Sequence, residues 1–242
     1  MTTQEFSDAF DTLVSSYRRF KDFDSKEILD SVEFNEYEKS YFLTKAQNEI
    51  VVSFYNGNTS SGESFESTEE QRRYLSNLVK EARLQPITNT SGLIIGIGSN
   101  SKFFTLPKDL WYITYEAVDL SDAKCKALST MDVYPVTQDD YNRTKRNPFR
   151  GANDRRALRL DLSDGVIEIV CKYTVKDYYI RYLKKPKPIV LVNLPDNLTI
   201  DGESNKTECE LHEALHQKIL ERAVAEALQS KITSSGDKDN NK

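Results

Sequence analysis

The sequence predicts an α+β fold, in which an N-terminal helical bundle is joined by a long C-terminal helix, with a β-rich block (sandwich or small barrel) between them. Early in the chain, apolar residues recur at three- and four-residue steps, the period of an amphipathic helix. Apolar and polar residues then alternate, as in half-buried strands, before helical spacing returns. We therefore predict a helical region over 1–90, a β-rich region over 91–206, a helix over 207–231 that packs on the helical region, and a polar tail over 232–242.

Four helices are predicted in the N-terminal region. The first covers residues 3–20, where aromatic and aliphatic side chains share one face. A second begins near Asp24 and a third at Asn35, each followed three residues later by the glutamate of a capping box. The third ends at Gly57, a residue typical of a helix C-terminus. The fourth runs over roughly 68–83, with four apolar side chains on one face.

The β-rich block contains one strong local signal, a hairpin. Leu158, Leu160 and Leu162 alternate with polar residues, Asp164-Gly165 supplies the turn, and Val166–Val170 runs back. Further strands are predicted in the runs KFFTL, LWYITYEAV, YYIRYL and PIVLVNL.

The last helix is predicted to begin at Thr207, with Glu210 completing its capping box. The residues beyond 231 have the polar composition of a disordered tail.

Composition and charge narrow the classes of function. The net charge of −5 argues against an overall nucleic-acid binder. The longest apolar runs are too short to span a bilayer and the N-terminus lacks a signal-peptide pattern, so we expect no membrane partner. An odd number of widely spaced cysteines favours reduced thiols; they are Cys125, Cys171 and Cys209.

The stretch His212-Glu213-Ala214-Leu215-His216 reproduces the H-E-x-x-H spacing of zinc peptidases. Two histidines four apart share one helix face, and the glutamate beside the first can serve as general base. However, only 26 residues follow His216, and the chain has no further histidine. Both histidines also lie within the apolar stripe of the predicted helix. Packing is therefore the favoured interpretation; a structural zinc site with Cys209 and a zinc-dependent peptidase are the alternatives.

A second motif is a glycine pair, Gly96-x-Gly98. It lacks the third glycine of a dinucleotide-binding loop and the Gly-Lys-Ser/Thr of a phosphate loop. We interpret it as a turn that enters a strand. We find no catalytic constellation in the sequence, and expect no catalytic residue, no cofactor and no metal ion.

The segment 142–159 is strongly basic, with seven cations against one acid, Asp154. Arginine suits paired contacts with carboxylates, so the segment can bind a neighbouring subunit. It can equally contact nucleic-acid phosphates, or form a solvated loop. The lysines of residues 183–188 share this ambiguity. The seven cations are Arg143, Lys145, Arg146, Arg150, Arg155, Arg156 and Arg159.

Four blocks together carry a family resemblance: FTLPKDLWYITYEAV, YNRTKRNPFRGANDRRALRLD, YYIRYLKKPKPIVLVNLP and CELHEALHQKILERAVAEALQSK. In this combination the chain resembles head-to-tail connector (adaptor) ring proteins of podovirus-like, crAss-like tailed bacteriophages. The resemblance covers about residues 100–232.

The resemblance implies a structural virion protein without catalytic residues. It implies a homo-oligomeric ring, commonly twelve-fold, in the head–tail connector, with the portal protein and a neighbouring tail or ring protein as partners. Genomic DNA would cross the channel and make non-specific contacts. The protein would be made in the cytoplasm of the bacterial host, and the tail Ile232–Lys242 would become ordered on assembly.

A ring interface joins two different faces of the same chain. We predict that the basic segment 142–159 meets an acidic face, such as Asp24–Glu38, of the next subunit. Changing Arg155 and Arg156 to glutamate should then block assembly without unfolding the monomer. A zinc-dependent peptidase using His212, Glu213 and His216, and a nucleic-acid-binding module using 142–159, are the competing functions.

Overall fold

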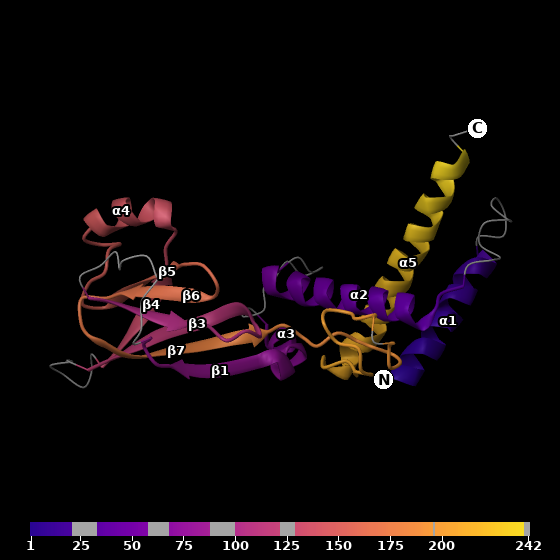
Figure 1. Cartoon of the computed structure of the whole chain (residues 1–242), viewed down its shortest axis with the longest axis horizontal. Helices are drawn as coiled ribbons and strands as arrows, with labels where there is room; N and C mark the ends of the chain where they lie inside the picture. Colours follow the sequence, from indigo (N-terminus) through magenta and orange to yellow (C-terminus); the bar gives the residue numbers. More distant parts are fainter. Residues whose placement is uncertain (21–32, 58–67, 88–99, 122–128, 196, 240–242) are drawn as a thin grey trace. The chain divides into compact units, whose positions relative to one another are not determined.

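The computed structural model divides the chain into two compact units (Figure 1). The helical unit comprises Met1–Leu78 and Pro186–Lys242, and the β unit comprises Val79–Lys185. The β unit is thus an insertion between the two segments of the helical unit. The residues that the structure describes are 1–20, 33–57, 68–87, 100–121, 129–195 and 197–239.

The helical unit is built around three helices: α1 (Thr3–Phe20), α2 (Glu36–Asn56) and α5 (His216–Asp239). Both α1 and α2 pack against α5. A short helix, α3 (Glu69–Tyr74), and a 3-10 turn at Ser76–Leu78 follow α2. The core consists of fully buried apolar side chains from these elements, including Phe6, Phe10, Leu43, Val51, Leu75, Ile219 and Ala223.

Two local predictions for α2 are confirmed. The Asn35 side chain accepts a hydrogen bond from the backbone N–H of Glu38, and the Glu38 side chain accepts one from Asn35. This reciprocal capping box satisfies two donors at the start of the helix. At the other end, Gly57 adopts φ 73°, the left-handed conformation that stops a helix and that glycine enters at little cost.

A buried lysine joins α1 to α2. The Nζ of Lys39 lies 2.7 Å from Asp11 Oδ2 and 2.9 Å from Glu36 Oε1, and donates to Ser7 Oγ at 3.1 Å. Burial alone would lower the pKa of Lys39, but the two carboxylates outweigh it and hold this pKa above its ordinary value. The side chain therefore stays charged and fixes the contact between the two helices.

The β unit is one mixed seven-stranded sheet with the order β1-β7-β3-β4-β5-β6-β2. All neighbours are antiparallel except β4 and β5, which are parallel and are connected by α4 (Gln138–Arg146). The strands are β1 (Val79–Leu84), β2 (Ser101–Thr105), β3 (Leu110–Leu120), β4 (Thr130–Pro135), β5 (Arg156–Asp161), β6 (Val166–Val170) and β7 (Val175–Lys184).

The sheet curls so that its inner face surrounds one core. The backbone N–H of Ile87, just after β1, donates to Phe103 O of β2 at 2.7 Å and so links the two ends of the sheet. Of the two predicted architectures, this single curled sheet is closer to a small barrel than to a sandwich. Its core is drawn from strands across the whole sheet and includes Phe104, Val118, Met131, Val133, Ala157, Ile167, Ile169, Tyr178 and Ile180.

The predicted hairpin is confirmed as β5 and β6. Its turn residues Asp164 and Gly165 both have positive φ, 57° and 70°. Two successive positive φ values match the right-handed twist of a two-residue hairpin, which explains why an Asp-Gly pair is found there.

The helix predicted over 68–83 is wrong in its second half. The helix α3 ends near Leu75, and the chain then forms strand β1, which pairs with β7 from Val79↔Leu183 to Leu84↔Tyr178. The ladder with β7 outweighs the weak helical preference of this stretch, because strand formation depends on the available partner. Strand β1 consequently belongs to the β unit, although its residues fall within the predicted helical region 1–90.

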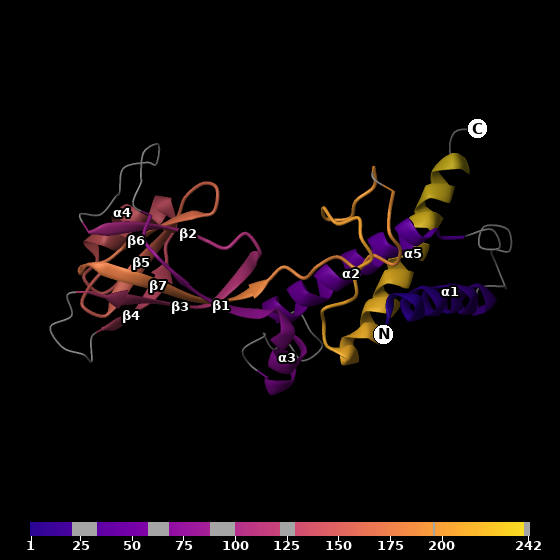
Figure 2. The ribbon, with the colours of Figure 1, turned by 60° about the horizontal axis from the view of Figure 1, so that its bottom comes forward.

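The strand predicted in PIVLVNL is also wrong, since only Val190 forms an isolated bridge, with Thr207. The segment instead lies along α2, as Figure 2 shows. Thr44 Oγ1 accepts from Ile189 N at 3.0 Å and donates to Ile189 O at 3.2 Å, and Ser40 Oγ accepts from Leu191 N at 3.0 Å. Helix side chains thus take the place of a neighbouring strand. Residues 186–206 belong to the helical unit, not to the β-rich block.

The C-terminal tail also differs from the prediction, because α5 continues through Asp239 and most of residues 232–242 are therefore helical. The helix predicted near Asp24 and the glycine pair Gly96-x-Gly98 lie outside the described residues. Among those described, no helix is both long and apolar enough to cross a membrane.

Candidate functional site

The H-E-x-x-H stretch does not lie on a single helix. His212 precedes a 3-10 turn at Glu213–Leu215, and its Nδ1 accepts a hydrogen bond from Ala214 N at 3.2 Å. His216 is the first residue of α5. The predicted start of this helix at Thr207 is wrong, because the backbone of Thr207 is paired with that of Val190 in an isolated bridge. The two histidines therefore lack the shared helix face that a zinc peptidase uses.

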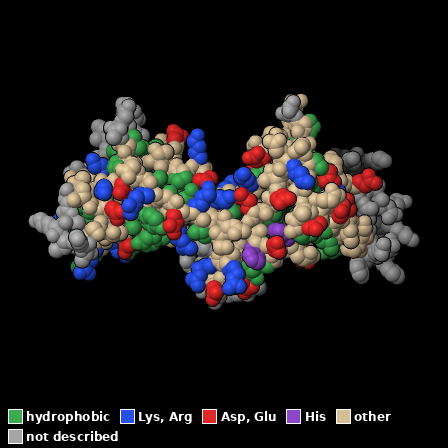
Figure 3. Space-filling view, turned by 90° about the horizontal axis from the view of Figure 1, so that it is seen from below, with side chains coloured by type: hydrophobic (Ala, Val, Ile, Leu, Met, Phe, Trp, Pro, Cys, Tyr) green, Lys and Arg blue, Asp and Glu red, His purple; other side chains and the backbone are tan. Residues whose placement is uncertain are grey.

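His216 is buried between α1 and its own preceding turn. Its Nδ1 lies 2.7 Å from the amino group of Met1, its Nε2 is 3.1 Å from Leu211 O, and its ring centroid is 5.3 Å from that of Phe6. Burial, together with the Met1 ammonium, lowers the pKa of His216. A neutral ring that accepts at Nδ1 and donates at Nε2 satisfies both contacts. Figure 3 colours histidine side chains purple, so the small part of the two histidines that reaches the surface can be followed there.

Cys209 is likewise engaged. Its Sγ donates to Gln47 Oε1 at 3.3 Å, and burial raises the pKa of its thiol to about 11. A zinc-bound cysteine is a thiolate, and burial disfavours that form at Cys209. In the part of the chain that the structure describes, no three His, Cys, Asp or Glu side chains form a metal-binding group. These contacts support the packing interpretation of Cys209, His212 and His216.

The basic segment spans α4, the loop after it and the start of β5. Five of its seven cations are exposed on α4 and the loop; they are Arg143, Lys145, Arg146, Arg150 and Arg155. Arg143 pairs with Asp140 of the same helix, at 2.7 Å. The guanidinium of Arg156 lies over the ring of Tyr134, 4.0 Å from its centroid, so Arg156 is partly occupied within the β unit.

Arg159 is inside the barrel, which removes it from the predicted contact residues. Its side chain is 12% exposed, and its Nη1 lies 2.6 Å from Oε1 of Glu116, itself 8% exposed. The other oxygen of Glu116 accepts from the hydroxyl of Tyr178 at 2.6 Å. Burial raises the pKa of both Glu116 and Tyr178. Arg159 therefore neutralises an internal carboxylate.

The opposite face of β5 explains this placement. Leu158 and Leu160 point away from the barrel core and are covered by Tyr141 of α4. Because α4 buries the outer face, β5 is buried on both sides, and its odd-numbered residues Ala157 and Arg159 face inward. The sequence contains one signal for this ion pair. Glu116 lies within the apolar run LWYITYEAV, and an acid buried in such a strand needs a cation beside it.

The most exposed large apolar side chain in the described residues is Phe149, at 85%. Asn147 Oδ1 accepts from the backbone N–H of Phe149 at 2.9 Å and of Arg150 at 3.3 Å. Gly151 N donates to Asn147 O at 2.8 Å. Gly151 itself is buried, and a Cβ there would meet Asn147 O at 3.0 Å. The loop is thus held in one shape, with the ring of Phe149 exposed to solvent.

Comparison with known proteins agrees with the resemblance found in the sequence. Residues 1–239 match the family described as phage tail ring protein 3/4. The chain is 44% identical over 242 residues to ring protein 3 of Bacteroides phage crAss001, covering 99% of this chain and 100% of that protein. It is 31% identical over 235 residues to ring protein 4/5 of the same phage, covering 93% and 91% respectively. The predicted resemblance is confirmed: the chain belongs to the phage tail ring protein 3/4 family, and is a structural ring protein of a phage tail.

Proposed function

We propose that this chain forms a homo-oligomeric ring, of twelve copies, in the connector that joins the head of the phage to its tail around the DNA channel. The ring would contact the portal protein and a neighbouring ring or tail protein. The observation that carries self-assembly is the separation of charge between the two units.

The two units carry opposite net charge. The β unit has 18 lysines and arginines against 13 acids, a net charge of +5, whereas the helical unit has 15 against 25, a net charge of −10. Because a closed ring joins two different faces of the same chain, each subunit can present its basic unit to the acidic unit of the next. Opposite charges then steer the subunits together and disfavour contacts between like faces.

The exposed cations of the basic segment are the proposed contact residues. They are Arg143, Lys145, Arg146, Arg150 and Arg155. Of the acidic face suggested from sequence, Asp24–Glu38, residues 24–32 lie outside those that the structure describes. In its described part, Glu36 binds Lys39 and Glu38 lies 3.0 Å from Lys231 of the same chain, so these two acids are already paired.

A charge-reversal experiment tests the contact. Arg150→Glu with Arg155→Glu removes two exposed cations and leaves the stacked Arg156 intact. Lys102→Glu with Lys176→Glu makes the same change of charge at exposed positions on β2 and β7 and is the matched control. We expect rings from the wild type and the control, and monomers from the arginine variant, by light scattering and electron microscopy.

The outcomes separate the parts of the proposal. Rings from the arginine variant would reject these residues as subunit contacts. Monomers from the wild type at every concentration would reject self-assembly. The position in the virion has its own test: gold-labelled antibody against this chain should mark one vertex, where head meets tail, and an absence of label on particles would reject the connector.

The same cations make DNA the second candidate partner. Five exposed Lys and Arg side chains on one helix and loop can contact phosphates without sequence preference. DNA binding should then weaken steeply with added salt, and should be lost in the arginine variant but retained in the lysine control.

A further inference from the structure

We propose that the loop carrying Phe149 in one copy docks into a groove along α2 of the next copy. The inference rests on the proposed ring and specifies its subunit interface. It commits to a second copy of this chain as the occupant of the groove.

The loop has the properties of an interface anchor. Phe149 is 85% exposed, so docking removes nearly its whole ring from water. Aromatic residues and arginine are enriched at protein interfaces, and here Arg150 follows the ring directly. Because Asn147 and the buried Gly151 already fix the loop, little conformational entropy is lost on binding.

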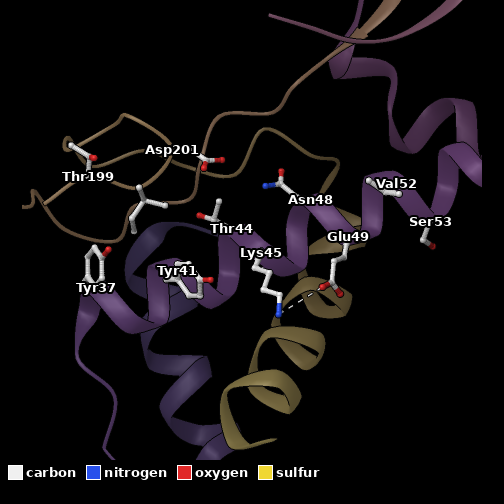
Figure 4. A pocket seen from close by; sticks show the side chains of 11 residues that line it. Tyr37, Tyr41, Thr44, Lys45, Asn48, Glu49, Val52, Ser53, Thr199 and Asp201 are labelled. Carbon is white, nitrogen blue, oxygen red and sulfur yellow. Dashed lines mark ion pairs between the residues drawn. The ribbon is translucent and has the colours of Figure 1, made fainter. Parts of the chain in front are cut away.

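The groove lies on the helical unit and has a volume of about 590 Å³. Tyr37 and Tyr41, one turn apart on α2, form part of its wall, and the loop at Thr199–Asp201 forms another (Figure 4). Tyr41 is 50% exposed, so an aromatic surface is open to a partner. The loop wall is fixed by two backbone hydrogen bonds between Ile200 and Glu203, of 2.9 and 3.0 Å.

The charge complementarity belongs to the two units as a whole. Of the two carboxylates that line the groove, Glu49 already binds Arg222 of the same chain, at 2.8 Å, and Asp201 is the other. The ammonium of Lys45, which also lines the groove, lies 4.0 Å from Glu49 (dashed in Figure 4) and 3.2 Å from Glu226, so its charge is balanced within the helical unit. An arriving loop brings the guanidinium of Arg150 beside its phenylalanine. This agrees with the opposite net charges of the two units.

A mixing experiment tests whether the loop and the groove meet each other. Phe149→Ala disables the loop, and Tyr41→Arg disables the groove by adding bulk and positive charge. Tyr17→Arg makes the same change at another exposed tyrosine of the helical unit and is the control. We expect each of the first two variants to associate at least about tenfold more weakly than the wild type, and the control to form rings.

Mixing the two disabled variants should restore a single contact. The intact loop of the Tyr41→Arg chain fits the intact groove of the Phe149→Ala chain, whereas the reverse contact is disabled on both sides. The mixture should therefore contain one-to-one heterodimers and no rings, which native mass spectrometry resolves.

Two results would overturn the inference while leaving the ring intact. Normal rings from Phe149→Ala alone would show that the phenylalanine is not a subunit contact. A mixture that stays monomeric, beside a wild type that forms rings, would show that the loop and the groove bind different surfaces. A wild type that never assembles would instead reject the ring and the inference together.

Discussion

The substitution Arg159→Ala tests whether this arginine stabilises the β unit or binds another molecule. Its Nη1 lies 2.6 Å from Glu116, and both side chains are almost fully buried. Removing the arginine leaves the Glu116 carboxylate without its cation, although the hydroxyl of Tyr178 still donates to it. Breaking a buried ion pair in this way costs about 3–5 kcal/mol.

Protonation of Glu116 sets a ceiling on that cost. The Arg159→Ala variant can avoid the unpaired charge by protonating Glu116. A glutamate has an ordinary pKa of about 4.3, so protonating it at pH 7 costs about 3.7 kcal/mol. The expected loss of unfolding free energy is therefore about 3–4 kcal/mol at pH 7. At pH 5 the same proton costs only about 1 kcal/mol. The sign follows from linkage: an acid whose pKa is raised by folding destabilises the fold progressively as pH rises above its unfolded pKa.

Urea unfolding at pH 7 and pH 5, at equal protein concentrations, measures both values. Arg155→Ala is the control, because this exposed arginine lies four residues away, and we expect it to change stability by less than about 0.5 kcal/mol. An Arg159→Ala protein as stable as the wild type at pH 7 would refute the internal ion pair. A loss that stayed the same at pH 5 would refute the assignment of that loss to the Glu116 charge.

Three further predictions concern the helical unit. Thr44→Val removes both hydrogen bonds to Ile189 and should cost about 1–3 kcal/mol, as read by urea unfolding; a cost near zero would show that the segment does not depend on them. Because folding lowers the pKa of His216, the unfolded chain binds a proton first as pH falls below about 6.5. Stability should therefore fall from pH 7 to pH 5, and less steeply in His216→Gln; equal slopes would contradict this. Since the thiol of Cys209 is protonated and bound to Gln47, equimolar zinc should raise the melting temperature by less than about 1 °C, and a larger rise would indicate a metal site.

The parts of the fold that were predictable are those set by neighbouring residues. The capping box of Asn35 and Glu38, the stop at Gly57 and the turn at Asp164-Gly165 all form as the sequence indicates. Each depends on contacts within a few positions along the chain. Local hydrogen bonds and backbone preferences are sufficient to determine them.

The errors occur where a distant partner decides the structure. Residues 79–84 become a strand because β7 is available to pair with them. The segment after Pro188 is bound by Ser40 and Thr44, about 145–151 residues away, and not by another strand. Thr207 forms a bridge with Val190 and so does not begin a helix. No local pattern in the sequence reports these partners.

The candidate site was predictable in composition but not in exposure. The basic segment was visible as a run of arginines, yet Arg159 turned inward because α4 covers the other face of β5. Phe149 was not predicted as a contact, because an aromatic residue in a sequence is assumed to be buried. Its exposure depends on the loop geometry that Asn147 and Gly151 impose.

The insertion of the β unit has a consequence for biosynthesis. Residues 79–185 are continuous, so this unit can fold as soon as it leaves the ribosome, whereas α1 and α2 must wait for α5. At ordinary rates of translation, the 54 residues from 186 to 239, the end of α5, take roughly 3–11 s to make. Until then the faces of α1 and α2 that pack on α5 have no cover, and truncated chains would be recognised by chaperones and proteases. Only a finished polypeptide can present a mature α2 surface to its neighbour, so incomplete products would be kept out of the growing particle.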